Sequence, residues 1–538
     1  GPVRDASLEN WNRLQPDLFD LRTRLQESIE RQESDQSIVD DANLLSERLT
    51  DVVTVPLQRA SDGPQVELFF GIYRQVSRQF WPRNTAARLR TMGVVVESMR
   101  GQNVAYVELR QGMGARLEAE IDARLREVNE LTEEGQPAPD VRVIITIPRR
   151  AATGEMAREL EALQRIRQNP RLRRVIVGID LSGIEMTGES AAGFRQLARQ
   201  IVLNNFRDYA ETLNQNPEVA GRVREILGED PIPRGDRLSD SIETETLAED
   251  IQTPTVSELA FLNRRIQEAL IEVGAESNQN LVPETIMGIT VHAGEQVTSA
   301  AVRIDALLEI VQDSLTMGTD RIGHGLALGI PLPEGLLHIG FREVQTPGGL
   351  VYARSFRGLN GEPVLEQYTP EQLFRMENQR RWLINLAANL RIPVEANPTS
   401  NMVLSGLARI PHPVGEMLAI RSDLRVSVST DNPAIHRIDV ASELALLMTS
   451  IQADFPLGVR IYLEGYASRM GARSLQNAGE LRSQILEGLV RVTPYGQRAE
   501  VMLEMYERFE IGSRPRSSAM STAEYENSLI PYLQRIIR

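Results

Sequence analysis

Short apolar runs rich in Val and Ile alternate along the chain with longer stretches in which apolar residues recur at helical spacing. Between the apolar runs lie amphipathic stretches such as Ala151–Gln168 and Ser299–Met317, which predict helices. Strands that alternate with helices favour a parallel sheet covered by helices, and eight such units predict an α/β fold of the (β/α)8 TIM-barrel type. The eight predicted strands are Phe19–Leu25, Val104–Arg110, Val141–Ile147, Val175–Leu181, Met287–His292, Arg321–His324, Pro393–Ala396 and Arg425–Ser429.

The uneven spacing of these units predicts two large insertions in the βα loops, at about 205–280 and 340–390. The second contains Gly348-Gly349 between β-prone runs, which predicts a hairpin, and then Thr369-Pro370-Glu371-Gln372, which predicts a capped helix start. We expect 1–18 to be an N-terminal segment, 19–512 to be the barrel, and 513–538 to be a helical C-terminal extension. Insertions in βα loops would lie over the catalytic face and could offer a surface to a protein partner.

Charge and composition exclude several classes of partner. The chain has 538 residues, a formal net charge of -15 and a sequence pI of about 5.1, so we expect neither nucleic acid nor an anionic membrane surface as its main partner. No apolar run is long enough for a membrane span, and no signal peptide opens the sequence. The absence of Cys excludes disulfides, thiolate zinc ligands and thiol nucleophiles.

All 59 basic residues are Arg, and Lys is absent. Arg-favouring codon usage would explain this, and so would selection against the amine that accepts ubiquitin. The second explanation predicts a bacterial effector or toxin-related protein delivered into a host cell, and the first is compatible with a cytoplasmic or secreted protein. Gly1-Pro2 resembles the pair of residues that a site-specific protease leaves, so we expect native sequence upstream.

Polar residues with catalytic chemistry stand at the ends of three predicted strands. His292 and Glu295 follow one strand, His324 ends the next, and Asp431 follows the last. Because the C-terminal ends of barrel strands meet at one mouth, we expect these four side chains to converge. Imidazole and carboxylate groups can ligate a metal and a carboxylate can transfer a proton, so the set predicts a hydrolytic site. The alternative for each residue alone is a satisfied polar group at a strand end.

These segments resemble the motifs of the adenosine deaminase family, in the order in which the family has them, over residues 20–435. The resemblance implies a (β/α)8 barrel of the metal-dependent purine nucleoside deaminases. The matching segments are His292–Glu295 (HAGE), Arg321–Gly325 (RIGHG), Asn397–Asn401 ((C/N)PTSN), Ser429–Pro433 (STD(D/N)P), Tyr106–Arg110 (YVELR) and Gly178–Gly183 (GIDLAG).

The resemblance implies a role for each matching site residue. His292 and Asp431 would be zinc ligands. Glu295 would protonate the purine ring nitrogen, and His324 would orient the attacking hydroxide. These four residues would form the catalytic and metal-binding part of the site.

Two further matches imply contacts with a purine. Gly183 would contact it through the backbone, and Asn432 would donate to the ring where many members of the family have Asp. Three remaining histidines match no ligand position. We expect His338, His412 and His436 on the surface or in loops, with His412 in a rigid loop between two prolines and His436 near enough to reach the mouth.

The first strand departs from the family pattern D-L-H-x-H-L-D-G-S-(I/L). Its best match is Asp20–Ile29, in which Arg22 and Arg24 replace the two His that would ligate zinc. A guanidinium has only donors and cannot ligate a metal. His292 and Asp431 alone fall short of the three protein ligands of a catalytic zinc. The alternative is that the true first strand lies upstream of this sequence, which contains no other His-x-His.

Two guanidinium groups match the charge of a lost Zn²⁺. Arg22 and Arg24 could pair with Glu295 and Asp431, or they could bind a phosphate or carboxylate of a ligand. We therefore expect a disabled or rebuilt metal site without a cofactor, in a pseudoenzyme that binds a purine nucleoside or nucleotide, or a protein partner. In the alternative, the chain is an active hydrolytic purine deaminase of the adenosine-to-inosine type with an atypical zinc site.

Overall fold

The computed structural model describes Val96, Met99 and most of the span from Tyr106 to Met470. The predicted first strand, the N-terminal segment 1–18 and the extension 513–538 therefore lie outside the described residues. The gaps within the described span are 113–116, 134–138, 150–152, 183–188, 229–255, 278–280, 299–301, 358–362, 406, 408–410, 432–439, 454–456, 459, 462–463, 466–467 and 469.

Seven strands form one parallel sheet whose order follows the chain, β1-β2-β3-β4-β5-β9-β10. Each coincides with a predicted strand to within two residues at either end, because strands buried on both faces appear in the sequence as continuous Val and Ile runs. Among the described residues, β1 and β10 each have one neighbour in the sheet. The strands are β1 Tyr106–Gly112, β2 Asp140–Pro148, β3 Ile176–Ser182, β4 Gly288–Ala293, β5 Arg321–His324, β9 Val394–Ala396 and β10 Val426–Val428.

The sheet is strongly curled. In a flat sheet, β1 and β9 would lie roughly 24 Å apart, since five strand spacings of about 4.8 Å separate them. Instead, the guanidinium of Arg110 on β1 donates to both carboxylate oxygens of Glu395 on β9, at 2.8 and 3.0 Å. The strands therefore wrap around a common interior. Within the described residues the sheet is not closed, and one further strand between β10 and β1 would close it into a barrel.

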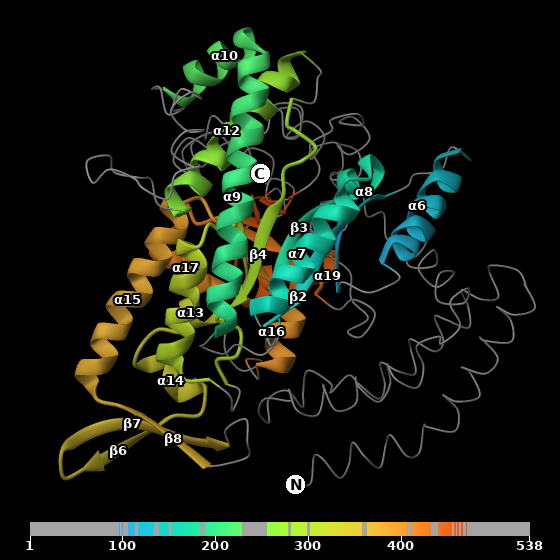
Figure 1. The fold of residues 1–538 in the computed structure, drawn as a ribbon. Helices are drawn as coiled ribbons and strands as arrows, with labels where there is room; N and C mark the ends of the chain where they lie inside the picture. The colour runs from blue at the N-terminus through green and yellow to red at the C-terminus, as the bar shows by residue number, and fades with distance from the viewer. Residues whose placement is uncertain are drawn as a thin grey trace, which may run out of the picture.

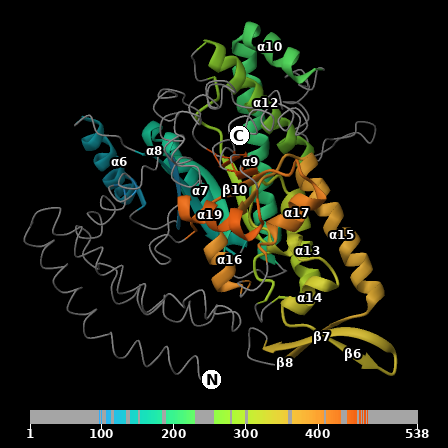
Figure 2. The same cartoon turned by 180° about the vertical axis from the view of Figure 1, so that it is seen from behind.

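Helices cover the outside of the curled sheet. Figure 1 shows α7, α9 and α13 in front of it, and Figure 2 shows α16, α17 and α19 from behind. The amphipathic spacing of α13 puts Leu307, Leu308, Val311 and Leu315 into the core. The helices of this layer are α6 Leu117–Glu133, α7 Thr153–Arg167, α8 Pro170–Val175, α9 Glu189–Gln215, α13 Ile304–Thr316, α16 Pro398–Leu404, α17 Val414–Ile420 and α19 Val440–Ser450.

The first insertion lies at the N-terminal ends of the strands and not in a βα loop, which corrects the prediction. The helix after β3 is α9, whose 27 residues span roughly 40 Å, and the additional chain follows at its far end as α10 (Pro217–Leu227) and α12 (Val256–Ser277). From α12, Arg264 contacts Thr319 and Asp320, immediately before β5 begins. This insertion therefore covers the face opposite the candidate site.

The second insertion follows β5, as predicted, and forms an antiparallel sheet at the end of the molecule opposite α10 (Figure 1). The helix that follows has its predicted capping box, since Thr369 and Gln372 exchange hydrogen bonds at 3.2 and 2.8 Å. Glu366 joins the small sheet to the barrel, because its carboxylate accepts from Arg354 at 2.6 Å and from the Ile304 N–H at 2.8 Å. The elements are η1 Leu326–Gly329, α14 Glu334–His338, β6 Arg342–Thr346, β7 Gly349–Arg357, β8 Pro363–Tyr368 and α15 Pro370–Asn389.

Candidate functional site

The structure places the described site residues at the C-terminal ends of the strands. His292 is the penultimate residue of β4, Glu295 follows β4, and His324 ends β5. Asp431 follows β10 by three residues. Arg22, Arg24, Gly183, Asn432 and His436 lie outside the described residues, so their predicted roles stay predictions.

Three of the predicted residues come together. The imidazole rings of His292 and His324 have their centroids 5.1 Å apart, and His324 Nε2 lies 3.7 Å from Glu295 Oε1. Asp431 is held separately, through a hydrogen bond of 2.8 Å that Ser400 Oγ donates to its carboxylate. The mouth therefore combines two imidazoles with a carboxylate within reach of one of them, which is a set able to bind or exchange protons with a polar ligand.

The backbone is strained at two of these positions. His324 has a φ of 68° and Asp431 a φ of 52°, both in the left-handed region that non-glycine residues rarely adopt. Such conformations persist where the surrounding structure holds them, and they are frequent at ligand sites. At His324, Gly325 follows with a φ of 62°, so the chain turns sharply as soon as β5 ends.

A fully buried carboxylate orients His292. Asp180 on β3 lies 3.1 Å from His292 Nδ1. Burial alone would raise the pKa of Asp180, but His292 and Arg110 outweigh it and lower that pKa. Burial likewise opposes the charge on His292, yet Asp180 raises the pKa of its imidazole. The hydrogen bond leaves His292 Nε2 as the ring nitrogen available to the mouth.

Sequence reasoning missed an ionic layer that fills the interior below the histidines. Arg110 binds Glu395, and Arg321 binds both Glu395 and Glu108, at 2.9 and 2.8 Å. The two arginines lower the pKa of Glu395 far below its usual range, although burial opposes this. TIM-barrel interiors are commonly filled by Val, Ile and Leu. In the sequence, Tyr106–Arg110 and Arg321–Gly325 indicated only strands and the family resemblance, and Pro393–Ala396 indicated only a strand.

His412 lies in the predicted loop between two prolines, but this loop is not at the surface. His338 is exposed, as predicted, but His412 is only 1% exposed. It lies behind the site and contacts Asn401, and burial lowers the pKa of its imidazole to about 3. Prolines on both sides indicate a loop, but they do not indicate whether that loop is covered, and here it packs under the start of α17.

Zinc is the group that the family resemblance implies. Within the described part of the chain, no set of three or more His, Asp and Glu residues is arranged to hold a metal ion. The hydrogen bond from Nδ1 to Asp180 leaves His292 Nε2 able to serve as one ligand, as in metal-ligating histidines. A catalytic zinc takes three protein ligands, so the described residues alone do not complete such a site.

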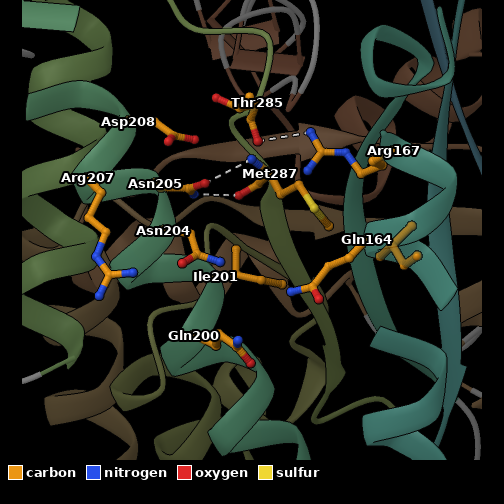
Figure 3. Close-up of a pocket in the computed structure, with 11 residues that line it drawn as sticks. Gln164, Arg167, Gln200, Ile201, Asn204, Asn205, Arg207, Asp208, Thr285 and Met287 are labelled. Carbon is orange, nitrogen blue, oxygen red and sulfur yellow. Dashed lines mark hydrogen bonds between the residues drawn. The ribbon is translucent and has the colours of Figure 1, made fainter. Parts of the chain in front are cut away.

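A separate cavity of about 340 Å³ lies between α7 and α9, at the opposite end of β4 from the histidines (Figure 3). On one side, Asn205 exchanges hydrogen bonds with the backbone of Met287, at 2.7 and 3.1 Å. On the other, Arg167 donates to the carbonyl of Thr285 at 2.9 Å. These contacts satisfy the backbone just before β4, so the polar lining serves the fold in part.

Among the described residues, no helix combines the length and apolar composition that crossing a membrane requires.

Comparisons with known proteins give neighbours only among solved structures, since no family profile and no curated sequence matches the chain. An adenine deaminase from Arthrobacter aurescens aligns over 80% of this chain and 87% of its own, with 13% identity and a TM-score of 0.43. Arabidopsis ADAL complexed with IMP aligns over 86% and 94%, with 15% identity and a TM-score of 0.41. The apo N6-methyl-AMP deaminase from Arabidopsis thaliana aligns over 86% and 94%, with 16% identity and a TM-score of 0.39. Because these TM-scores are below 0.5, the neighbours establish neither the fold nor the function of this chain.

Proposed function

We propose that this chain is an adenosine-deaminase-like (β/α)8 barrel in which arginines have replaced the metal, and that it binds a purine nucleoside or nucleotide at its mouth. The observation that carries the proposal is the convergence of His292, Glu295 and His324, which are distant in sequence and belong to separate motifs. An eighth strand at Phe19–Leu25 would stand between β10 and β1. Arg22 and Arg24, two residues apart, would then point to the same face of that strand.

Two guanidiniums carry the same charge as a divalent cation. Arg22 and Arg24 could therefore supply the positive charge that a metal would bring to the carboxylates of the mouth.

Ligand binding is the activity that remains when the metal is lost. Without a metal, the pKa of water is not lowered to about 7, and hydroxide is scarce at neutral pH. The mouth would still offer a carboxylate and two imidazoles to the polar edge of a purine. The arginines of the first strand would add an anion site for a phosphate group.

A metal-restoring variant tests the proposal. Elemental mass spectrometry of chelator-free protein should find no stoichiometric zinc in the wild type. Arg22→His with Arg24→His should gain about one zinc per chain, because His292 and Asp431 would complete four ligands. Arg22→Gln with Arg24→Gln removes the same charges without adding ligands and should gain none. Calorimetric titration with adenosine, AMP and IMP should detect binding to the wild type. Failure of all three to bind would overturn the proposed function.

A second candidate is an active purine deaminase with an atypical metal site. The observation that favours it is the retention of Glu295 and His324 within 3.7 Å of each other. This candidate requires about one zinc per chain in the wild type and adenosine deamination that Glu295→Gln abolishes. That pair of results would replace the first proposal by the second.

A further inference from the structure

A chain of hydrogen bonds connects the mouth to the start of α17. The two terminal atoms of the Asn401 side chain lie 2.9 Å from His324 Nδ1 and 2.9 Å from His412 Nε2. All three residues are buried, with at most 1% of each exposed. The far side of the His324 ring faces Glu295. Protons along this chain therefore have few arrangements that satisfy every group.

The backbone at the start of α17 determines which ring nitrogen of His412 carries a proton. The first N–H groups of a helix have no partner within the helix, and the Val414 N–H donates to His412 Nδ1 at 3.3 Å. A ring nitrogen that accepts carries no proton. Burial also keeps His412 neutral near pH 7, because it lowers the pKa of the imidazole to about 3. His412 therefore carries its single proton on Nε2.

This proton determines the orientation of Asn401. His412 Nε2–H needs an acceptor, so the Asn401 atom beside it is the oxygen. The Asn401 nitrogen then faces His324 Nδ1 and donates to it. This carboxamide orientation is the reverse of the one drawn in the structure, and both have the same shape. A second donor supports it, since Asn397 Nδ2 lies 3.2 Å from the same His324 nitrogen.

We propose that Asn401 and His412 are positioning residues that hold His324 as a neutral imidazole with its proton on Nε2, directed at Glu295 and the mouth. The lone pair of His324 is then occupied at Nδ1. His324 donates a hydrogen bond to an oxygen or nitrogen of the ligand and does not act as a base toward water. The tautomer follows from the hydrogen bonds alone, and only the nature of the ligand depends on the proposed function.

Nitrogen NMR of the histidine rings tests the tautomer directly. The chain has five His, so protein labelled with ¹⁵N-histidine gives few signals, and substitution of each His assigns them. The expected result is a protonated Nε2 and an unprotonated Nδ1 for both His324 and His412 in the unliganded wild type. A protonated Nδ1 on His324 would overturn the proposal without any variant or ligand.

Asn401→Asp supplies the second readout. A carboxylate at this position only accepts, so both neighbouring ring nitrogens would have to donate to it, and His324 should become protonated at Nδ1. Asn216→Asp makes the same change at an exposed position before α10 and should leave both rings as in the wild type. An unchanged His324 in folded Asn401→Asp would contradict the positioning role. If no purine binds the wild type, the proposed function fails, while the NMR result still decides the tautomer.

Discussion

Removing one charge from the ionic layer measures how much the interior contributes to the stability of the curled sheet. Glu395 accepts two hydrogen bonds from Arg110, at 2.8 and 3.0 Å, and its carboxylate lies 2.9 Å from Arg321 Nε. Its side chain is 4% exposed. Glu395→Gln keeps the shape, removes the charge and turns an amide donor toward a guanidinium. Breaking a buried ion pair on one side costs about 3–5 kcal/mol, so the free energy of unfolding should fall by about that amount at pH 7.

The same variant makes a prediction about pH. The folded pKa of Glu395 is lowered, so its contribution to stability is complete above the unfolded pKa of about 4.3 and is lost as the pH falls through the folded pKa. The difference in unfolding free energy between wild type and Glu395→Gln should therefore be largest at neutral pH. It should shrink as the pH falls below about 4.3, because Glu395 of the unfolded wild type then takes up a proton while the folded carboxylate stays ionised.

Urea denaturation, followed in parallel by intrinsic fluorescence and circular dichroism, provides both numbers and shows whether the transition is two-state. Glu309→Gln is the matched control, because Glu309 is exposed on α13 and the substitution should change stability by no more than about 0.5 kcal/mol. If Glu395→Gln costs no more than the control, the ionic layer does not stabilise the fold and the reasoning is refuted.

Two further substitutions test the packing around the site. Gly329→Ala would place a methyl group against the carbonyl of Pro413, just before α17. It should lower the free energy of unfolding, measured by thermal or urea denaturation, by about 1–3 kcal/mol. The control is Gly221→Ala, in open space on α10, which should be neutral or stabilise the protein by up to about 1 kcal/mol. Equal effects would mean that the close approach of η1 and α17 is not rigid. Glu366→Gln should speed amide hydrogen exchange in β6–β8 by an amount corresponding to about 3–5 kcal/mol, because the buried Arg354 would lose its ion pair with Glu366. Unchanged exchange there, measured by mass spectrometry, would show that this pair does not anchor the small sheet.

The sheet could be predicted from the sequence because each of its strands is a local feature. The run Val141–Ile147 and the short run Arg321–His324 both became strands, the second with the predicted ends. The capped helix after Thr369 was equally local, since its signal lies within four residues. The predicted position of the first insertion was wrong. The distance in sequence between two strands gives the number of residues in the connection, but not the end of the connecting helix at which the additional chain begins.

The interior could not be predicted because its partners are far apart along the chain. Arg110 and Glu395 are separated by 285 positions, and they meet only because the sheet curls. The burial of His412 has the same origin, since it depends on how α17 packs against η1 and not on the prolines beside it. A sequence pattern identifies which residues end the strands, but the contacts among them depend on the curvature of the whole sheet.

If the metal is lost, as proposed, two explanations exist for the site residues that persist, and the structure distinguishes them residue by residue. Asp180 is fully buried and lies 3.5 Å from Arg110, whose side chain is 20% exposed. Removing Arg110 would take a counter-charge from a buried carboxylate, so stability alone explains why this pair is retained. His324 differs, because its φ of 68° costs folding free energy, of the order of 1–3 kcal/mol for a strained residue. Gly would adopt this backbone at lower cost. A histidine at this position, held by two Asn side chains, favours the proposed ligand binding over a mouth that is only a remnant.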